Sequence, residues 1–186
     1  FLVSGSNNFR KVLFQDYKSK RPPSPPLRGF LTSYVESKYG GFRAVGCEAD
    51  DVVVALHKKM RESGLECVVA TNDKDLKQIS CRFFDYYYQR MSLSDISEDE
   101  ARFNFWSQVL IGDGGDGVLG LKGYGKAKPP KIFKGCKTDF SYLRASYREY
   151  LKVYKSKARQ KLTKTFTLVK LYDNVETPDI NDFNQL

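Results

Sequence analysis

The stretch GCEADDVVVALHKKMRESG, residues 46–64, decides the predicted fold. Its apolar residues recur at helical spacing over 48–63, and Gly64 is suited to end the helix. The next residues, LECVVAT at 65–71, are apolar and rich in β-branched side chains, which is typical of a buried strand. A helix followed so closely by such a strand predicts an α/β fold.

The composition is that of a globular protein. The chain has 186 residues, 41% of them hydrophobic, and lacks both a signal-peptide pattern and an apolar run near the roughly 20 residues that cross a bilayer. We therefore expect a soluble, cytosolic protein. Its net charge of +9 indicates a polyanionic partner, either nucleic acid or an anionic membrane surface. Four cysteines without a CxxC pair indicate neither a disulfide framework nor a zinc ribbon, and we interpret the single His57 as a surface or boundary residue.

Other segments carry weaker signals. FLV at 1–3 and RFFDYYY at 82–88 predict strands, and the residues after Ser97 predict a helix that begins with a capping box. Residues 174–186 are interpreted as a tail. Two further helical patterns predict buried faces. The first covers 27–39, with a face made of Leu27, Phe30, Leu31, Tyr34 and Val35. The second lies in the basic region after Pro129, with a face made of Leu143, Tyr147, Tyr150, Leu151, Tyr154 and Ala158.

Acidic residues gather at three places beside predicted strand or helix ends. Taken singly, each cluster has an ordinary interpretation as a helix cap, a charge that complements the helix dipole, or a turn. Together they predict one cleft, because open α/β sheets bring such ends to a common crevice. Carboxylates so close need divalent cations, and oxygen ligands alone suit two Mg²⁺ or Mn²⁺ ions, the arrangement that hydrolyses phosphodiesters. The candidate metal ligands are Glu48, Asp50, Asp51, Asp73, Asp75, Asp113 and Asp116.

The segment GLKGYGKA, residues 120–127, fits a Walker A loop except at its last position, where Ala127 replaces Ser or Thr. Pro129 is expected to force Lys128 toward an extended conformation, which also argues against a helix there. We interpret the segment instead as a hairpin whose backbone approaches DNA phosphates. Its candidate DNA-binding residues are Lys122, Gly123, Gly125, Lys126 and Lys128.

Four blocks in order, NFRKVLFQDYKSKR, GCEADDVV, VVATNDKDLKQI and LIGDGGDGVLGLKGYGKAKPPKIF, resemble the structure-specific 5′-nucleases of bacteria and bacteriophages. The resemblance covers residues 7 to about 134. It implies a PIN-like α/β core with a mainly parallel sheet over 1–111 and a helical, hairpin-containing DNA-binding region over 112–186, with K⁺ as a possible ion at the hairpin. It also implies a 5′-3′ exonuclease or flap endonuclease in the cytoplasm of a bacterium or phage-infected cell. The implied partner is DNA with 5′ ends or flaps, or RNA:DNA hybrids, and not a membrane.

The resemblance assigns roles to residues of the first block. Lys18 and Arg21 match the basic pair that reaches the scissile phosphate, and Tyr17 matches an aromatic residue that stacks on a base. Arg10 and Lys11 are candidates for holding the nearby DNA backbone, with ordinary surface charges as the alternative.

The sequence also departs from the family pattern. The usual N-terminal strand with its ligand Asp is absent, no acid precedes Asp16, and the segment between Arg21 and Gly46 is short for a large helical arch. Two alternatives to a nuclease therefore stay open. One is a catalytically impaired DNA-binding protein of the same fold, and the other, ranked last, is a protein that binds RNA or a membrane surface.

Overall fold

The computed structural model describes residues 1–5, 7–87 and 91–179. Contacts divide the chain into two compact units, and each is described by itself. Unit 1 comprises Phe1–Gln15, Arg21–Val69 and the segment from Leu171, and unit 2 comprises Asp16–Lys20 and Ala70–Lys170. The predicted domain boundary between residues 111 and 112 does not coincide with the division between these units, and it stays a prediction. None of the helices described is long and apolar enough to cross a membrane.

Unit 1 is built on a short parallel strand pair and one long helix. Strand β1 (Leu2–Val3) pairs with β2 (Phe42–Arg43), with Leu2 opposite Phe42, so the predicted strand in FLV is confirmed. The helices of the unit are α1 (Phe9–Leu13), α2 (Arg28–Tyr39) and α3 (Ala49–Glu62).

Helix α3 confirms the helix predicted over 48–63. Its first turn holds Asp50 and Asp51 and its last turn holds Lys59 and Arg61, the arrangement that complements a helix dipole. Gly64, at φ 73°, follows its end. One face of the helix packs into the core of the unit, which consists of Ala44, Cys47 and Val52 with Leu2, Phe9, Phe42 and Val175. His57 is also buried, with 8% exposure, and burial lowers its pKa, so its interpretation as a surface residue was wrong.

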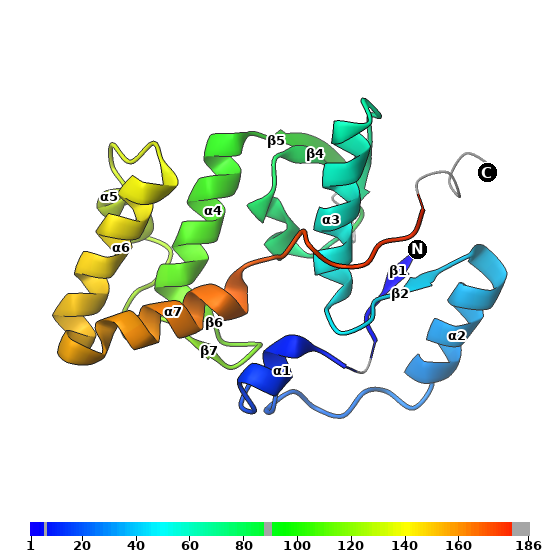
Figure 1. Cartoon of the computed structure of the whole chain (residues 1–186), viewed down its shortest axis with the longest axis horizontal. Coiled ribbons are helices and arrows are strands. Elements are labelled where there is room, and N and C mark those ends of the chain that lie inside the picture. The colour runs from blue at the N-terminus through cyan, green and yellow to red at the C-terminus, as the bar shows by residue number, and fades with distance from the viewer. Residues whose placement is uncertain (6, 88–90, 180–186) are drawn as a thin grey trace. The chain divides into compact units, whose positions relative to one another are not determined.

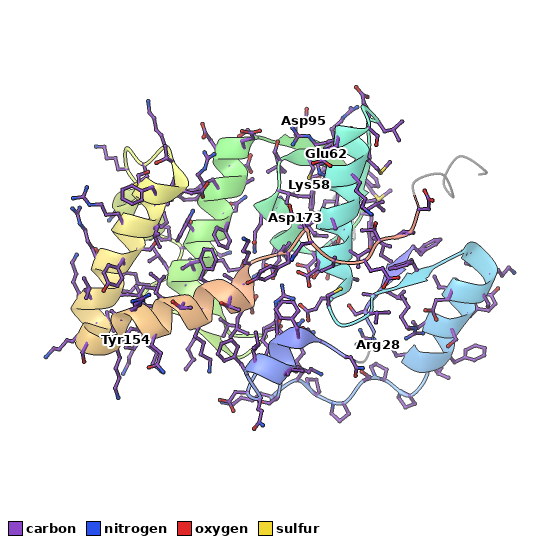
Figure 2. The ribbon with its side chains drawn as sticks, in the orientation of Figure 1. Arg28, Lys58, Glu62, Asp95, Tyr154 and Asp173 are labelled. Carbon is purple, nitrogen blue, oxygen red and sulfur yellow. The ribbon has the colours of Figure 1, made fainter. Side chains whose placement is uncertain are left out.

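Two further predictions about unit 1 were wrong. Helix α2 forms as expected, yet none of its residues is buried, and Leu27, Phe30, Leu31 and Tyr34 are exposed. The interpretation of 174–186 as a tail fails for the part described, because Val175 packs against the core and Lys59 donates a hydrogen bond to Thr177. Asp173, which directly precedes this segment, forms an ion pair of 2.8 Å with Lys58, and both residues are labelled in Figure 2. Residues 180–186 lie outside the described residues.

Unit 2 combines small sheets with a group of helices (Figure 1). Strand β3 (Val68–Ala70) lies at the division between the units, which falls between Val69 and Ala70. Helices α4, α6 and α7 pack together. The other elements are η1 (Lys74–Gln78), β4 (Cys81–Asp85), β5 (Ser92–Ile96), α4 (Glu98–Ile111), β6 (Gly112–Asp113), β7 (Val118–Leu119), α5 (Pro129–Ile132), α6 (Asp139–Tyr154), η2 (Lys155–Lys157) and α7 (Ala158–Val169).

The helices of unit 2 are capped and packed as their sequences dictate. Of the predicted capping box, the bond from the backbone N–H of Glu100 to the side chain of Ser97 forms and begins α4. Trp106 is buried among aromatic rings, and the hydroxyl of Tyr150 donates to the carbonyl of Val109 at 2.7 Å. The stripe predicted as core after Pro129 is only partly so, because Tyr150 and Ala158 are buried whereas Leu143, Tyr147 and Leu151 are exposed.

The α/β class is confirmed, but the sheets differ from the single, mainly parallel sheet expected. In the described residues β1 and β2 pair in parallel, whereas β4–β5 and β6–β7 are antiparallel. The predicted strand over 82–88 is β4, and Tyr88 lies outside the described residues. Lys128 is another correction: its φ of −85° and ψ of −45° are helical, and α5 begins directly after it, with Pro129 at the first helical position. Proline suits that position because no intrahelical bond needs its missing N–H.

Candidate metal centre and nucleic-acid interface

The acidic residues of unit 1 lie at the start of α3, where Glu48 is the N-cap. Asp51 is fully buried, and its two carboxylate oxygens accept hydrogen bonds from both guanidinium nitrogens of Arg10 and from the backbone N–H groups of Glu48 and Tyr172, at 2.6–3.0 Å. A carboxylate has about four positions for such bonds, so these four occupy it. Asp51 therefore holds α1, α3 and the segment after Leu171 together, and it is a support for the neighbouring acids rather than a metal ligand.

Arg10 was expected at the DNA backbone, and the structure corrects this. Only 1% of its surface is exposed, and besides the two bonds to Asp51 its guanidinium lies 3.8 Å from Glu48 and 4.6 Å from the ring centroid of Phe9. A buried guanidinium already bonded to a carboxylate cannot reach a phosphate without breaking that pair. Lys11, by contrast, is exposed.

In unit 2, Asp73 and Asp75 follow β3 directly, as predicted. Asp73 caps η1 by accepting a hydrogen bond of 2.9 Å from the backbone N–H of Asp75. Asp75 is the more unusual group: burial, together with the nearby charges of Asp73 and Asp113, raises its pKa from an ordinary value of 3.8 to about 6. The ammonium of Lys74 lies 3.9 Å from Asp75 and 3.8 Å from Asp113, which offsets part of this repulsion.

Asp113 and Asp116 belong to the hairpin formed by β6 and β7. The carboxylate of Asp113 accepts hydrogen bonds from the backbone N–H groups of Gly115 and Asp116, at 2.9 and 3.3 Å, which shapes the turn. Asp116 instead meets the segment Asp16–Lys20: it accepts a hydrogen bond from the hydroxyl of Tyr17 at 3.1 Å and lies 3.4 Å from the ammonium of Lys18. The hairpin thus fixes the position of two residues expected at the DNA.

Tyr17, Lys18 and Arg21 differ in their surroundings. Tyr17 is buried, with 3% exposure, so its ring is not presented for stacking on a base as expected. Lys18 has a left-handed backbone, at φ 57°, and its N–H donates to the carbonyl of Asp116 at 2.9 Å. Arg21 is exposed and belongs to unit 1.

The acids have the oxygen donors that Mg²⁺ and Mn²⁺ prefer, and the pKa of Asp75 is raised chiefly by burial and next by the charge of Asp73. In the part of the chain described, no three acidic, histidine or cysteine side chains are grouped closely enough to hold a metal ion. Asp73, Asp75 and Asp113 therefore interact electrostatically without forming such a group. The predicted centre also requires Glu48 and Asp50 of unit 1, and it stays a prediction.

The glycine-rich segment predicted to contact DNA is a loop between β7 and α5. Gly123 has φ 78°, and a side chain added at Gly123 or Gly125 would meet no atom within 4 Å, so the backbone there is open to a ligand. Lys122 and Lys126 are exposed. Two contacts absent from the sequence prediction hold the loop: the hydroxyl of Tyr124 donates to Glu149 at 2.6 Å, and the ammonium of Lys128 lies 3.8 Å from the ring centroid of Tyr124.

Gln108 is a second contributor that the sequence did not indicate. Its side-chain amide lies 3.5 Å from a carboxylate oxygen of Asp113, and its hydrogen bond to Asp75 counteracts part of the rise in that pKa. The only sequence signal is its place one turn before the end of α4, on the approach to the hairpin.

Comparisons with known proteins show which family the chain belongs to. The profile of the family described as "5′-3′ exonuclease, N-terminal resolvase-like domain" matches residues 2–104. The chain is 26% identical over 174 residues to DNA polymerase I of Caldicellulosiruptor bescii, a match that covers 82% of this chain and 20% of the relative. It is 26% identical over 138 residues to flap endonuclease Xni of Shewanella piezotolerans, covering 68% of this chain and 54% of the relative. The chain thus spans between a fifth and about half of the length of these relatives.

Solved structures show the same fold. The bacteriophage T5 D15 protein co-crystallised with metal ions aligns with a TM-score of 0.59 and 13% identity, over 91% of this chain and 85% of that one. A complex of T5 D15 flap endonuclease with DNA and metal ions aligns with a TM-score of 0.59 and 12% identity, over 90% and 82% of the two chains. At this level of identity the likeness concerns the fold alone, and it confirms the predicted PIN-like α/β architecture.

Proposed function

Because the chain belongs to the family of 5′-3′ exonuclease N-terminal resolvase-like domains, we propose that it is a metal-dependent nuclease that hydrolyses DNA phosphodiester bonds at or near 5′ ends. The observation that carries the proposal is the family match over residues 2–104, which includes the acids from Glu48 to Asp75. The relatives named as flap endonucleases support a flap or 5′ end as the substrate.

Five carboxylates are the proposed ligands of two Mg²⁺ or Mn²⁺ ions: Glu48, Asp50, Asp73, Asp75 and Asp113. Their oxygen atoms suit these ions, and a cation beside Asp75 would offset the charges of Asp73 and Asp113, which add to the rise in its pKa that burial causes. Solved structures of the same fold that contain metal ions support the use of a metal. When bound, such ions activate a water molecule and stabilise the charge on the departing oxygen of a phosphodiester.

The chain's own residues have complementary tasks in this proposal. Asp51 and Arg10 fix the start of α3 and so orient Glu48 and Asp50. Asp116 holds Lys18, whose ammonium would move to the scissile phosphate and offset its growing negative charge. Arg21, Lys122, Lys126 and the open backbone at Gly123 and Gly125 would hold the DNA backbone, with K⁺ as an additional ion at the loop.

The proposal is tested by cleavage of a 5′-labelled flap duplex with Mg²⁺, with Mn²⁺ and with EDTA. We expect cleavage with either ion, none with EDTA, and a loss of at least about 100-fold in rate for Asp75→Asn. Asp95→Asn is the matched control, because Asp95 is an acid of the same unit whose side chain is 83% exposed. Asp95 is labelled in Figure 2. A protein that binds the flap but leaves it intact with every divalent ion would be a DNA-binding protein without nuclease activity. An RNA:DNA hybrid flap in the same assay compares the two substrates.

A further inference from the structure

Unit 2 contains a cleft of about 330 Å³, formed by η1, α4 and the residues around the start of α5. We call it the α4 cleft. Its volume is within the range of about 300–1,000 Å³ that small-molecule sites occupy in proteins. It lies beside the acidic residues of the unit, since Asp75 and Gly112 are part of its lining.

The α4 cleft is positively charged. Its lining includes three lysines, Lys74, Lys77 and Lys126, and one carboxylate, Asp75. The ammonium of Lys74 is shared between Asp75 and Asp113, whereas the ammonium of Lys77 lies 4.9 Å from the ring centroid of Phe83, a contact that leaves it its full charge. Counted over the lining, the excess of two positive charges matches a phosphate monoester, which carries about 1.5 to 2 negative charges at pH 7.

The same cleft has apolar and hydrogen-bonding surfaces. Phe103 and Ile111 of α4 contribute apolar lining, of the kind against which a flat ring packs. The hydroxyl of Ser107, also in the lining, is buried and has no hydrogen-bond partner, a condition that it shares with only Ser146 among the described residues. Buried hydroxyls in proteins are rarely left in that state, so Ser107 is suited to bond to a ligand.

We propose that the α4 cleft binds one nucleotide unit, with its phosphate between Lys77 and Lys126, its hydrogen-bonding groups at Ser107 and its ring against Phe103 and Ile111. The charge and the apolar lining define the class of ligand as a phosphate ester of a ring compound, and its identity as a nucleotide rests on the proposed nuclease function. The occupant is either a released mononucleotide or the terminal nucleotide of a strand.

The test is equilibrium dialysis of the protein against deoxyadenosine monophosphate in EDTA, so that no metal takes part. We expect deoxyadenosine, which lacks the phosphate, to bind at least about tenfold more weakly. Lys77→Gln should weaken binding of the nucleotide about tenfold and Ser107→Ala about fivefold. Lys134→Gln and Ser156→Ala, exposed residues of the unit outside the cleft, should leave it unchanged. Urea unfolding of each variant verifies that it folds.

Several results would overturn the proposal: no binding of the nucleotide, equal binding of deoxyadenosine, or an equal loss for Lys134→Gln and Lys77→Gln. Competition with a 5′-phosphorylated trinucleotide distinguishes the two occupants. If the trinucleotide displaces the mononucleotide, the occupant is the end of a strand. If it does not, the occupant is the released product. The flap assay is independent of this measurement. Loss of nucleotide binding with intact cleavage would refute the cleft alone, and intact binding without cleavage would refute only the nuclease proposal.

Discussion

The ion pairs Arg10–Asp51 in unit 1 and Lys18–Asp116 in unit 2 join the same kinds of charge in different ways. The first is bidentate, at 2.6 and 2.8 Å, and both side chains are buried. In the second, the ammonium of Lys18 lies 3.4 Å from a carboxylate oxygen of Asp116, and the two side chains keep 16% and 13% exposure. In the sequence both cations lie in one basic segment, and both acids lie in clusters predicted to bind metal.

The difference distinguishes an ion pair that supports the fold from a lysine that is available to bind a phosphate. Breaking a buried pair leaves an uncompensated charge away from water, which costs about 3–5 kcal/mol, so Arg10 and Asp51 stay together. The side chains of Lys18 and Asp116 keep some exposure, so water can help to compensate both charges when Lys18 moves to a phosphate. Residue type alone does not distinguish these roles, whereas burial and the number of hydrogen bonds do.

The strongest test of the comparison is Asp51→Asn. We expect it to lower the free energy of unfolding by about 3–5 kcal/mol, because Arg10 would remain buried without its carboxylate. Urea unfolding measures the change. Glu62→Gln, an exposed acid at the other end of α3, should change the free energy by less than about 0.5 kcal/mol. A loss of less than about 1 kcal/mol for Asp51→Asn would mean that the pair does not support the unit.

The corresponding change in unit 2 is Lys18→Met, which removes the charge and keeps most of the stem. We expect turnover on a flap substrate to fall about 100-fold, roughly 2.7 kcal/mol, because the ammonium acts on charge that develops in the transition state. DNA affinity and the free energy of unfolding should change much less, and Lys20→Met, an exposed lysine two residues on, is the control. Equal losses of turnover and affinity would make Lys18 a binding contact only.

The third test concerns Asp75, whose pKa rises from 3.8 to about 6 on folding. Between those values the folded protein holds a proton that the unfolded chain has lost, so stability falls as pH rises from about 4 to about 6 and then levels off. The effect is about 1–3 kcal/mol. Asp75→Asn should remove this slope and leave a more stable protein at pH 7, as measured by urea unfolding at several pH values. A slope that persists in the variant would assign it to another group.

Local patterns in the sequence predicted much of the fold. Helix α3 carries its own periodicity, dipole-matched charges and terminal glycine, and α4 carries its own cap, so both formed where expected. The acids of unit 2 were also placed correctly, Asp73 and Asp75 after β3 and Asp113 and Asp116 among glycines after α4, because a strand end and a glycine-rich turn are local features. The family resemblance was confirmed by the profile match.

What failed depends on partners far along the chain. The periodicity of α2 indicates an apolar face but not whether anything covers it, and its face is exposed. Tyr172 and Val175 lie in a segment without periodicity, yet one donates to Asp51 and the other packs against the core. The role of Asp51 follows from bonds to residues 41 and 121 positions away, which no local pattern contains.

The smallest expected effect concerns the loop held by Tyr124. Its hydroxyl bonds to Glu149 of α6, so Tyr124→Phe removes one hydrogen bond worth about 1 kcal/mol and should weaken binding of duplex DNA about fivefold. Tyr147→Phe, an exposed tyrosine of the same helix, should have no effect. The salt dependence of binding separates positioning from contact. Tyr124→Phe should leave its slope unchanged, because no phosphate contact is lost, whereas Lys122→Gln should reduce the slope by about one. A reduced slope for Tyr124→Phe would mean that the loop no longer presents its lysines, and the hydrogen bond would then determine which contacts form.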